Sequence, residues 1–289
     1  MVTPGPPEVP EGLDLAALEE VACEVARAAG RLVVEDRPDD LDVSSKSTRT
    51  DVVTEMDQRS QELILAELAR RRPDDAVMGE EEGGLSGTSA VTWVVDPIDG
   101  TVNYLYGIAH YAVSVAAVVG DPAVPGGWRS VAGAVFEPVS DELFHAHLGG
   151  GARLAAGGGV RTLRVIGPTD LGLSLVATGF GYDAAVRARQ ANALVEVITA
   201  VRDVRRQGSA ALDLCDVAAG RLDAYYETGL NAWDRAAGQL VATEAGAVLG
   251  GPVDDTPDAD LTWAAAPGVA APFADLVRRV TAEHVTRRP

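Results

Sequence analysis

Cysteine is scarce in this 289-residue chain, which contains only Cys23 and Cys215. The two are far apart and form no CxxC pair, so neither a disulfide framework nor a cysteine-rich zinc cluster is indicated. We therefore expect a reduced, cytoplasmic setting. A hydrophobic content of 47% is that of a globular protein, and the length allows one large domain or two lobes of ordinary size.

Positive charge is also scarce. The chain has 24 Lys and Arg against 43 Asp and Glu, a formal net charge of -19, and Lys46 is its only lysine. Nucleic acid is not an expected partner, because its recognition needs clustered Lys and Arg that neutralise phosphates. The same charge would repel a small anionic substrate unless bound divalent cations reverse the local potential.

Long hydrophobic runs are missing as well. No uninterrupted apolar segment approaches the ~20 residues of a membrane helix, so we expect no membrane association. The first residues, MVTPGPPEVPEG, are rich in proline and lack the basic start and apolar core of a signal peptide. We predict a disordered tail over residues 1–12.

The first half of the chain predicts two amphipathic helices followed by short strands. Apolar residues recur every three or four positions over 13–34 and 55–71, and Pro73 ends the second pattern. The glycine-rich stretch 149–159 lacks the spacing of a nucleotide-binding loop and predicts hairpin turns. Short segments rich in β-branched and aromatic residues, typical of antiparallel strands, lie at 91–95, 111–119, 131–138 and 141–147.

The second half alternates between strand-like and helix-like segments, which argues for strands covered by helices. We therefore predict an α+β fold with an N-terminal lobe over 13–160, built on an antiparallel sheet, and a C-terminal lobe over 161–289, with a mixed sheet. The expected strands of the second lobe start at Leu173, Asp203 and Leu222, and its helices start at Ala184, Ser209 and Ala232.

Two aspartates, Asp96 and Asp99, stand three residues apart in WVVDPIDGT (93–101). Asp before Pro or Gly is a common turn former, and that explanation suffices for most such pairs. Here the preceding apolar run predicts a buried strand, which puts both carboxylates at its C-terminal end, a usual place for function. Pro97 fixes the backbone between them, and Gly100 permits a close approach or an unusual dihedral angle. Such carboxylates are typical ligands of Mg²⁺.

Further acidic candidates lie elsewhere, and each has an ordinary alternative. Glu80, in MGEEEGG, could belong to a solvated acidic loop. Asp234, in NAWDRAAG, could be a first-turn residue of a helix that Asn231 caps. Thr54 and Asp57, in DVVTEMD, could be helix-start residues. Alone, none of them establishes a site.

In their order and combination these motifs resemble the inositol monophosphatase family, part of a lithium-sensitive, Mg²⁺-dependent phosphatase superfamily. The likeness extends from about residue 13 to 285, and several blocks look most like bacterial inositol-1-phosphatases. It implies a layered α-β-α-β-α sandwich with the site between two lobes, and family members are commonly homodimers. The motifs that carry it are GEE (79–81), WVVDPIDGT (93–101), WDRAAG (233–238) and, more weakly, DVVTEMD (51–57).

The resemblance implies a metal site with two Mg²⁺ ions. Glu80, Asp96 and the backbone carbonyl of Ile98 would bind one ion. Asp96, Asp99 and Asp234 would bind the second, so that Asp96 bridges the two. A third, weaker Mg²⁺ is implied near Glu80.

The resemblance also implies catalytic and substrate contacts. Thr101 and Asp57 match a pair that orients the nucleophilic water or relays its proton, and Glu80 belongs to the catalytic set. Lys46, at the family's spacing before Asp57, is either close to the site or a solvated loop residue. The implied substrate contacts are Asp99, Gly100, Thr101, Ser209, Ala210, Glu227 and Asp234.

We therefore predict Mg²⁺-dependent hydrolysis of inositol 1-phosphate. Histidinol phosphate, fructose 1,6-bisphosphate and 3′-phosphoadenosine 5′-phosphate are alternative substrates on the same scaffold, because the metal motif indicates the reaction and not the leaving group. A non-catalytic regulatory protein with the same fold ranks lower, since it would be expected to have lost metal ligands that are all present here.

Overall fold

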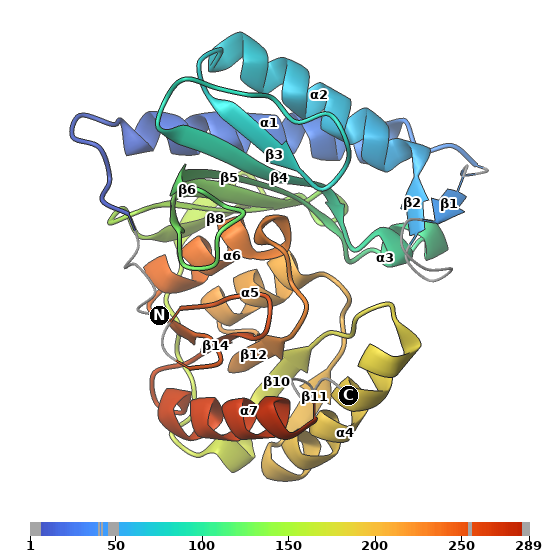
Figure 1. Cartoon of the computed structure of the whole chain (residues 1–289), viewed down its shortest axis with the longest axis vertical. Coiled ribbons are helices and arrows are strands. Elements are labelled where there is room, and N and C mark those ends of the chain that lie inside the picture. The colour runs from blue at the N-terminus through green and yellow to red at the C-terminus, as the bar shows by residue number, and fades with distance from the viewer. Residues whose placement is uncertain (1–6, 40, 42, 46–51, 254–255, 285–289) are drawn as a thin grey trace.

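Five alternating layers of helix and sheet make up the molecule (Figure 1). The computed structural model describes residues 7–39, 41, 43–45, 52–253 and 256–284. From one side to the other, the layers are a helix pair, a seven-stranded sheet, a second helix pair, a five-stranded sheet and a third helix pair. This order confirms the predicted α+β class and the α-β-α-β-α sandwich.

The first sheet is built by strands that follow one another in the chain and in space. Strands β3 and β4 pair in parallel, and every later pair is antiparallel, with short connections between all of them except β4 and β5, which residues 100–111 join. The glycine-rich stretch supplies hairpin turns as predicted, with Gly157 and Gly158 both at positive φ between the last two strands. The strands are β3 (Ala76–Gly79), β4 (Val91–Asp99), β5 (Ala112–Gly120), β6 (Trp128–Glu137), β7 (Glu142–His147), β8 (Ala152–Ala156) and β9 (Gly159–Thr162).

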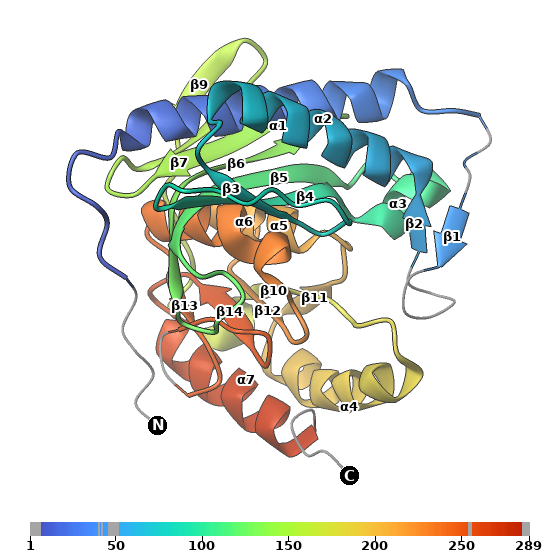
Figure 2. The same cartoon turned by 45° about the horizontal axis from the view of Figure 1, so that its top comes forward.

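Helices α1 (Leu15–Glu35) and α2 (Glu55–Arg71) cover the outer face of this sheet (Figure 2). Asp14 starts α1 by accepting a hydrogen bond from the backbone N–H of Ala17 at 3.0 Å. The apolar stripe of α1 packs on β5 and β6, where Leu18 and Val25 are buried with Trp93. Both predicted helices are therefore confirmed. Strands β1 (Val43–Ser45) and β2 (Val52–Thr54) form a small separate ribbon before α2.

The second sheet has the strand order β11-β10-β12-β14-β13, with parallel pairs at one end and antiparallel pairs at the other, which confirms a mixed sheet. Its outer face carries α4 (Ala184–Ala200) and α7 (Ala270–His284). Sequence analysis did not predict α7, nor the two strands before it. The strands are β10 (Leu175–Thr178), β11 (Asp203–Arg205), β12 (Ala224–Glu227), β13 (Val248–Gly250) and β14 (Thr262–Ala265), and a short 3-10 helix, η1 (Leu171–Leu173), precedes β10.

Helices α5 (Ala210–Ala218) and α6 (Ala232–Glu244) lie between the two sheets. All of α5 is buried, because it has a sheet on each side. Residues of both helices share one hydrophobic core with the first sheet, including Cys215 and Val94. The two lobes are thus joined by a continuous core, and β9 carries the first sheet to Thr162, two residues into the predicted second lobe.

The predicted tail lies partly outside the described residues, which begin at Pro7. Residues 7–12 contain no helix or strand, and Val9 packs against the core beneath α1. In the part of the chain that the structure describes, no helix is both long and apolar enough to cross a membrane.

Candidate metal-dependent active site

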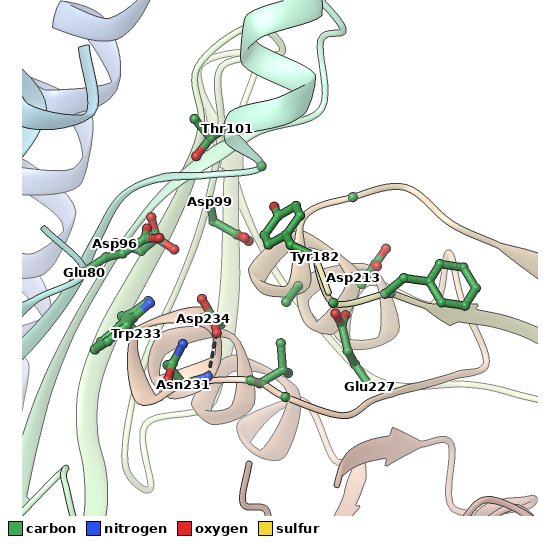
Figure 3. Close-up of a pocket in the computed structure, with 18 of the residues that line it drawn as sticks. Glu80, Asp96, Asp99, Thr101, Tyr182, Asp213, Glu227, Asn231, Trp233 and Asp234 are labelled. Carbon is green, nitrogen blue, oxygen red and sulfur yellow. Dashed lines mark hydrogen bonds between the residues drawn. The ribbon is translucent and has the colours of Figure 1, made fainter. Parts of the chain in front are cut away.

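Acidic side chains from both sheets and from α6 line one cavity of about 300 Å³ (Figure 3). Glu80, Asp96 and Asp99 lie on the side of the first sheet, and Asp234 lies opposite them at the start of α6. Glu227 approaches from the end of β12. The cavity therefore brings together residues that are up to 154 positions apart in the chain.

The sequence predicted that this strand ends at Val95. In the structure β4 continues through both aspartates and ends at Asp99. Its pairing with β5 shifts register between Asp96 and Asp99, so β4 has one extra residue there and bulges at the cavity. The backbone N–H of Ile98 donates to Oδ1 of Asp96 at 3.0 Å, and Ser60 donates to the Pro97 carbonyl at 3.0 Å. These contacts fix the bulge from both ends.

Gly100 ends the bulge in a left-handed conformation, with φ +98°. A Cβ atom there would also lie 3.2 Å from the carbonyl oxygens of Gly208 and His110. Only glycine fits such a position without strain, which confirms the unusual dihedral angle expected from the sequence. The chain then turns into α3 (Thr101–Tyr106), a short helix that sequence analysis did not predict.

Asp99 is held by the start of α5. Ser209 donates its hydroxyl to Oδ2 of Asp99 at 2.6 Å, and the backbone N–H of Ala211 donates to the same oxygen at 2.7 Å. The Ser209 oxygen also accepts from the Leu212 N–H at 3.2 Å and so caps α5. Because Ser209 is 1% exposed, its hydroxyl positions Asp99 from behind the cavity, whereas Ala210 lines the cavity itself.

Glu80 follows β3, and its backbone N–H donates to the Val95 carbonyl at 3.2 Å. The rest of the acidic loop is attached to α2 through Gln61, whose amide accepts from the Glu81 N–H at 3.0 Å and donates to the carbonyls of Glu81 and Glu82. Sequence analysis missed Gln61, because nothing local distinguishes it from other helix-surface glutamines. The loop is thus fixed by hydrogen bonds and is not simply a solvated acidic run.

Asp57 and Thr101 lie in direct contact. The Thr101 hydroxyl is 3.1 Å from Oδ1 of Asp57 and equally far from the carbonyl oxygen of Ile98. The other oxygen of Asp57 accepts from the backbone N–H and the hydroxyl of Thr54, at 2.8 and 2.6 Å. Asp57 is therefore both a helix-start residue and a partner of Thr101, so the two interpretations of DVVTEMD are compatible.

Asp234 likewise has two roles in the geometry. Its Oδ2 accepts from the backbone N–H of Asn231 at 2.6 Å, which is ordinary first-turn capping of α6, while the carboxyl group faces the cavity. Trp233 and Asn231 line the cavity beside it. The capping role orients the carboxylate and does not compete with a function in the cavity.

The far side of the cavity carries the predicted substrate contact Glu227. The Tyr225 hydroxyl donates to Oε2 of Glu227 at 2.7 Å. Gly179 makes room for this carboxylate, because a Cβ atom at position 179 would lie 2.0–2.2 Å from its atoms. Asp213 and Arg206 also line the cavity, and sequence analysis missed both. Asp213 accepts from Gln207 at 2.9 Å, a contact that depends on tertiary structure and has no local sequence signal.

Electrostatics set this cavity apart from ordinary acidic surfaces. Burial raises the pKa of Asp96 well above its usual range, and the negative charges of Glu80, Asp99 and Asp234 raise it further. The pKa of Asp99 rises to about 6 and that of Glu227 to about 7, in both cases mainly through burial. Gathering these carboxylates around one cavity is unfavourable, and among the described residues that line it Arg206 is the only basic side chain.

The donor set suits a hard divalent cation. All candidate ligands are carboxylate or carbonyl oxygens, which Mg²⁺ prefers, and the raised pKa values of Asp96 and Asp234 are what a bound cation would reverse. Among the described residues, no three His, Cys, Asp or Glu side chains already form a closed ligand group. The carboxylates instead surround a cavity, which leaves space for water and substrate oxygens to complete the coordination.

Three further residues from the sequence have different outcomes. Lys46 lies outside the described residues, as does Asp51. His110, to which the sequence assigned no role, has its Nδ1 3.6 Å from a carboxylate oxygen of Glu137, whereas its Nε2 is buried without a partner. Burial by itself raises the pKa of Glu137, but the His110 and Ser140 side chains outweigh it and bring the pKa below its usual value.

The layered sandwich and its acidic cavity between the sheets define a class of small-molecule phosphatases. The sequence matches the inositol monophosphatase family over residues 14–286, and the chain belongs to that family. It is 51% identical over 235 residues to the inositol-1-monophosphatase of Mycobacterium leprae. The aligned region covers 79% of this chain and 78% of that relative.

Other relatives of this chain carry different names. The solved structure of Mycobacterium tuberculosis SuhB is 40% identical, with a TM-score of 0.75, and covers 93% of this chain and 98% of its own. A protein named Nus factor SuhB, from Pasteurella multocida, is 40% identical over 233 residues, covering 79% of this chain and 83% of the relative. Family membership supports a phosphatase and small phosphate substrates, and the family is generally metal-dependent.

Proposed function

We propose that this protein hydrolyses myo-inositol 1-phosphate to inositol and phosphate in a Mg²⁺-dependent reaction. The observation that carries the proposal is the convergence of Glu80, Asp96, Asp99 and Asp234 on one cavity in a member of the inositol monophosphatase family. Phosphate monoesters hydrolyse extremely slowly without catalysis, so a cavity that can concentrate positive charge on the phosphate has a clear chemical purpose.

Two Mg²⁺ ions are the proposed cofactors, with a third near Glu80. Glu80, Asp96 and the Ile98 carbonyl would hold the first, and Asp96, Asp99 and Asp234 the second. When bound, Mg²⁺ supplies positive charge that polarises the phosphate ester and makes a water molecule more acidic. The bulge at Asp96, the cap at Asp234 and the Ser209 contact keep these oxygens directed at the cavity.

Thr101 and Asp57 are the proposed proton-handling pair, with Glu80 as a further catalytic carboxylate. The Thr101 hydroxyl can pass its proton to Oδ1 of Asp57 as its oxygen takes a proton from the attacking water. Burial raises the pKa of Asp57 to about 6, although hydrogen bonds from Thr54 oppose the rise. A carboxylate with that pKa is a competent proton acceptor near neutral pH.

The proposed substrate contacts divide by chemistry. The backbone N–H groups of Gly100 and Thr101 would meet the phosphate. Glu227 would accept hydrogen bonds from inositol hydroxyls, and Ala210 leaves space beside them. Asp99 and Asp234 lie between the phosphate contacts and the inositol contacts. They would bind the ester both directly and through the metal ion that they hold.

A substrate panel tests the proposal. Phosphate release from inositol 1-phosphate, histidinol phosphate, fructose 1,6-bisphosphate and 3′-phosphoadenosine 5′-phosphate should be measured with Mg²⁺ and with EDTA. We expect Mg²⁺-dependent turnover with the highest kcat/KM for inositol 1-phosphate. Asp96→Asn should abolish turnover. Preference for histidinol phosphate would overturn the substrate assignment, and wild-type activity of Asp96→Asn would overturn the metal assignment.

A regulatory role is the second candidate function, and the relatives named Nus factor SuhB motivate it. It ranks lower for this chain, because a purely regulatory protein has no need for an intact set of buried, mutually repelling carboxylates.

We further propose, by analogy with the family, that the protein is a cytoplasmic homodimer and that lithium inhibits it. Light scattering and a lithium titration of the phosphatase reaction would check these two properties.

A further inference from the structure

Asp213 lies on the same side of the acidic cavity as Glu227, across from the proposed metal ligands Glu80 and Asp96 (Figure 3). It comes from the first turn of α5, whereas Glu227 ends β12. An acidic residue in the first turn of a helix is common and by itself suggests no function. Asp213 differs from most such residues in its position, because it lines the cavity although it is only 1% exposed.

Gln207 holds the Asp213 carboxyl group in place. The side-chain amide of Gln207 donates to Oδ1 of Asp213 at 2.9 Å and to Oδ2 of Asp216 at 3.1 Å, which uses both of its hydrogens. The backbone carbonyl of Gln207 in turn accepts from the Asn103 amide at 2.7 Å, so the network extends to α3. Asp213 is therefore positioned at the cavity by contacts from outside its own helix.

Asp213 and Glu227 each keep one oxygen available for a ligand. No described residue donates to Oδ2 of Asp213, whose Oδ1 is bonded to Gln207. Tyr225 donates to Oε2 of Glu227, and no described residue donates to its Oε1. Burial raises the pKa of both groups, that of Glu227 to about 7, and the charge of Glu227 raises the pKa of Asp213 further. The pair therefore carries less than its full negative charge at neutral pH.

Two such oxygens suit a ligand with hydroxyl groups on neighbouring carbons. Hydroxyls can donate to both carboxyl groups and accept from a protonated one, whereas a phosphate or carboxylate supplies no donor and is repelled. Among the described residues that line the cavity, the only basic side chain is that of Arg206, and it is exposed, so water and salt screen its charge. This side of the cavity is thus better suited to a polyol than to a second anionic group.

We propose that Asp213 determines specificity for polyol phosphates: its Oδ2 accepts a hydrogen bond from one hydroxyl of the leaving group, while Glu227 accepts from a neighbouring hydroxyl. This inference rests on the proposed phosphatase function and extends it from one substrate to a class, the phosphate monoesters of polyols that carry no second anionic group. A second phosphate on this side of the cavity would face both carboxyl groups.

Asp213→Asn tests the proposal with little change in shape. The asparagine oxygen can keep the hydrogen bond from Gln207, so that an NH₂ group replaces Oδ2 at the cavity and a donor replaces an acceptor. In steady-state kinetics with Mg²⁺, we expect KM for inositol 1-phosphate and for glucitol 6-phosphate to rise about tenfold, with kcat within about twofold of the wild type. 4-Nitrophenyl phosphate has no polyol hydroxyls, so its KM should not change.

Fructose 1,6-bisphosphate gives a second measurement, which a merely structural role of Asp213 would not change. Because the substitution removes a negative charge, the ratio of kcat/KM for this bisphosphate to that for inositol 1-phosphate should rise at least about tenfold. If Asp213→Asn does not fold, Asp213→Ala decides the matter by the same four substrates. An unchanged KM for both polyol esters, or an equal loss with 4-nitrophenyl phosphate, would overturn the inference and leave the proposed function standing.

Asp216→Asn is the matched control. Asp216 lies on the same helix and accepts from the same Gln207 amide, but it does not line the cavity. Its variant should keep the wild-type KM for all four substrates, and losses equal to those of Asp213→Asn would show that the Gln207 network matters and not a contact with the polyol. A wild type that hydrolyses glucitol 6-phosphate and not inositol 1-phosphate would overturn the proposed substrate alone, whereas turnover of neither ester would overturn both proposals.

Discussion

The hydroxyl oxygen of Thr101 lies 3.1 Å from Oδ1 of Asp57, although 44 positions separate the two residues in the chain. The contact joins the start of α3 to the start of α2, and both side chains are buried. Thr54 fixes the Asp57 end by donating to the other carboxylate oxygen, and the Ile98 carbonyl oxygen, also 3.1 Å from the Thr101 oxygen, is an alternative acceptor for the single hydroxyl hydrogen of Thr101. A carboxylate held in this way beside a hydroxyl group is preorganised for proton transfer.

Removing the hydroxyl of Thr101 should therefore slow the chemical step. We expect Thr101→Ala to lower kcat by about 10²- to 10³-fold, within the range for a positioned proton-transfer group. Thr101→Ser keeps the oxygen and should stay within about tenfold of the wild type. Steady-state kinetics with inositol 1-phosphate measure both. Similar losses for the two variants would show that the methyl packing of Thr101 matters and not its hydroxyl.

Ser209 should act on catalysis through Asp99 although it is buried behind it. Ser209→Ala removes the 2.6 Å hydrogen bond to Asp99 and the N-cap of α5. Loss of the cap should lower the free energy of unfolding by about 1 kcal/mol. We expect the Mg²⁺ concentration for half-maximal activity to rise about tenfold, with a melting temperature a few degrees lower. Ser209→Thr retains both hydrogen bonds and serves as the control. An unchanged Mg²⁺ requirement in Ser209→Ala would remove Ser209 from the metal site.

Sequence reasoning succeeded where residue type and backbone geometry coincide. Asp-Pro and Asp-Gly bracket the bulge of β4, and Gly100 has the positive φ that its position suggested. The helices 15–35 and 55–71 were predictable because their apolar stripes repeat over several turns. The short helix α3 was not predictable, because its six residues are too few for a helical period to be visible.

The residues that support the site were mostly beyond sequence reasoning. Gln61 contacts the acidic loop from 20 positions away, and its local sequence is that of any solvated helix. Ser209 was predicted to line the substrate side, yet its hydroxyl bonds to Asp99 across 110 positions. Helix α7 is different, since apolar residues such as Phe273, Leu276, Val277 and Val280 provided a periodic signal that could have predicted it.

Bound Mg²⁺ should stabilise the protein through the carboxylates. Asp96 is buried among like charges, so Asp96→Asn should raise the melting temperature of the metal-free protein while abolishing its response to Mg²⁺. For the wild type, Mg²⁺ at about 100 times its dissociation constant should raise the free energy of unfolding by about 2.7 kcal/mol and the melting temperature by several degrees. Differential scanning fluorimetry with Mg²⁺ and EDTA measures both effects. A Mg²⁺-dependent shift that persists in Asp96→Asn would contradict the predicted bridging role.

Glu19 should make the protein sensitive to acid. Burial by itself raises the pKa of Glu19, but hydrogen bonds and charges of His145 and His147 outweigh it and bring the pKa to about 2. A folded-state pKa below the ordinary value of 4.5 contributes stability above about pH 4.5 that is lost as the pH falls towards 2. We expect a contribution on the order of 2 kcal/mol at neutral pH, because the side chain is only 8% exposed.

Urea unfolding of Glu19→Gln between pH 3 and pH 7 checks this expectation. The variant should be less stable than the wild type at pH 7, and the difference should shrink as the pH falls. Glu62→Gln, at an exposed position on α2, is the control and should track the wild type throughout. A stability difference that does not change with pH would mean that Glu19 acts through packing and not through its charge.

Gly179 should control recognition of the inositol ring through Glu227. A methyl group at position 179 would lie 2.0–2.2 Å from the Glu227 carboxylate, which must then move, since it is the end of a flexible side chain. We expect Gly179→Ala to raise KM for inositol 1-phosphate about tenfold while kcat changes little, because the metal ligands are untouched. 4-Nitrophenyl phosphate has no inositol hydroxyls and should show no such change. In the Glu227→Gln background, Gly179→Ala should have almost no further effect, and additive losses in this double-mutant cycle would show that the two residues act independently.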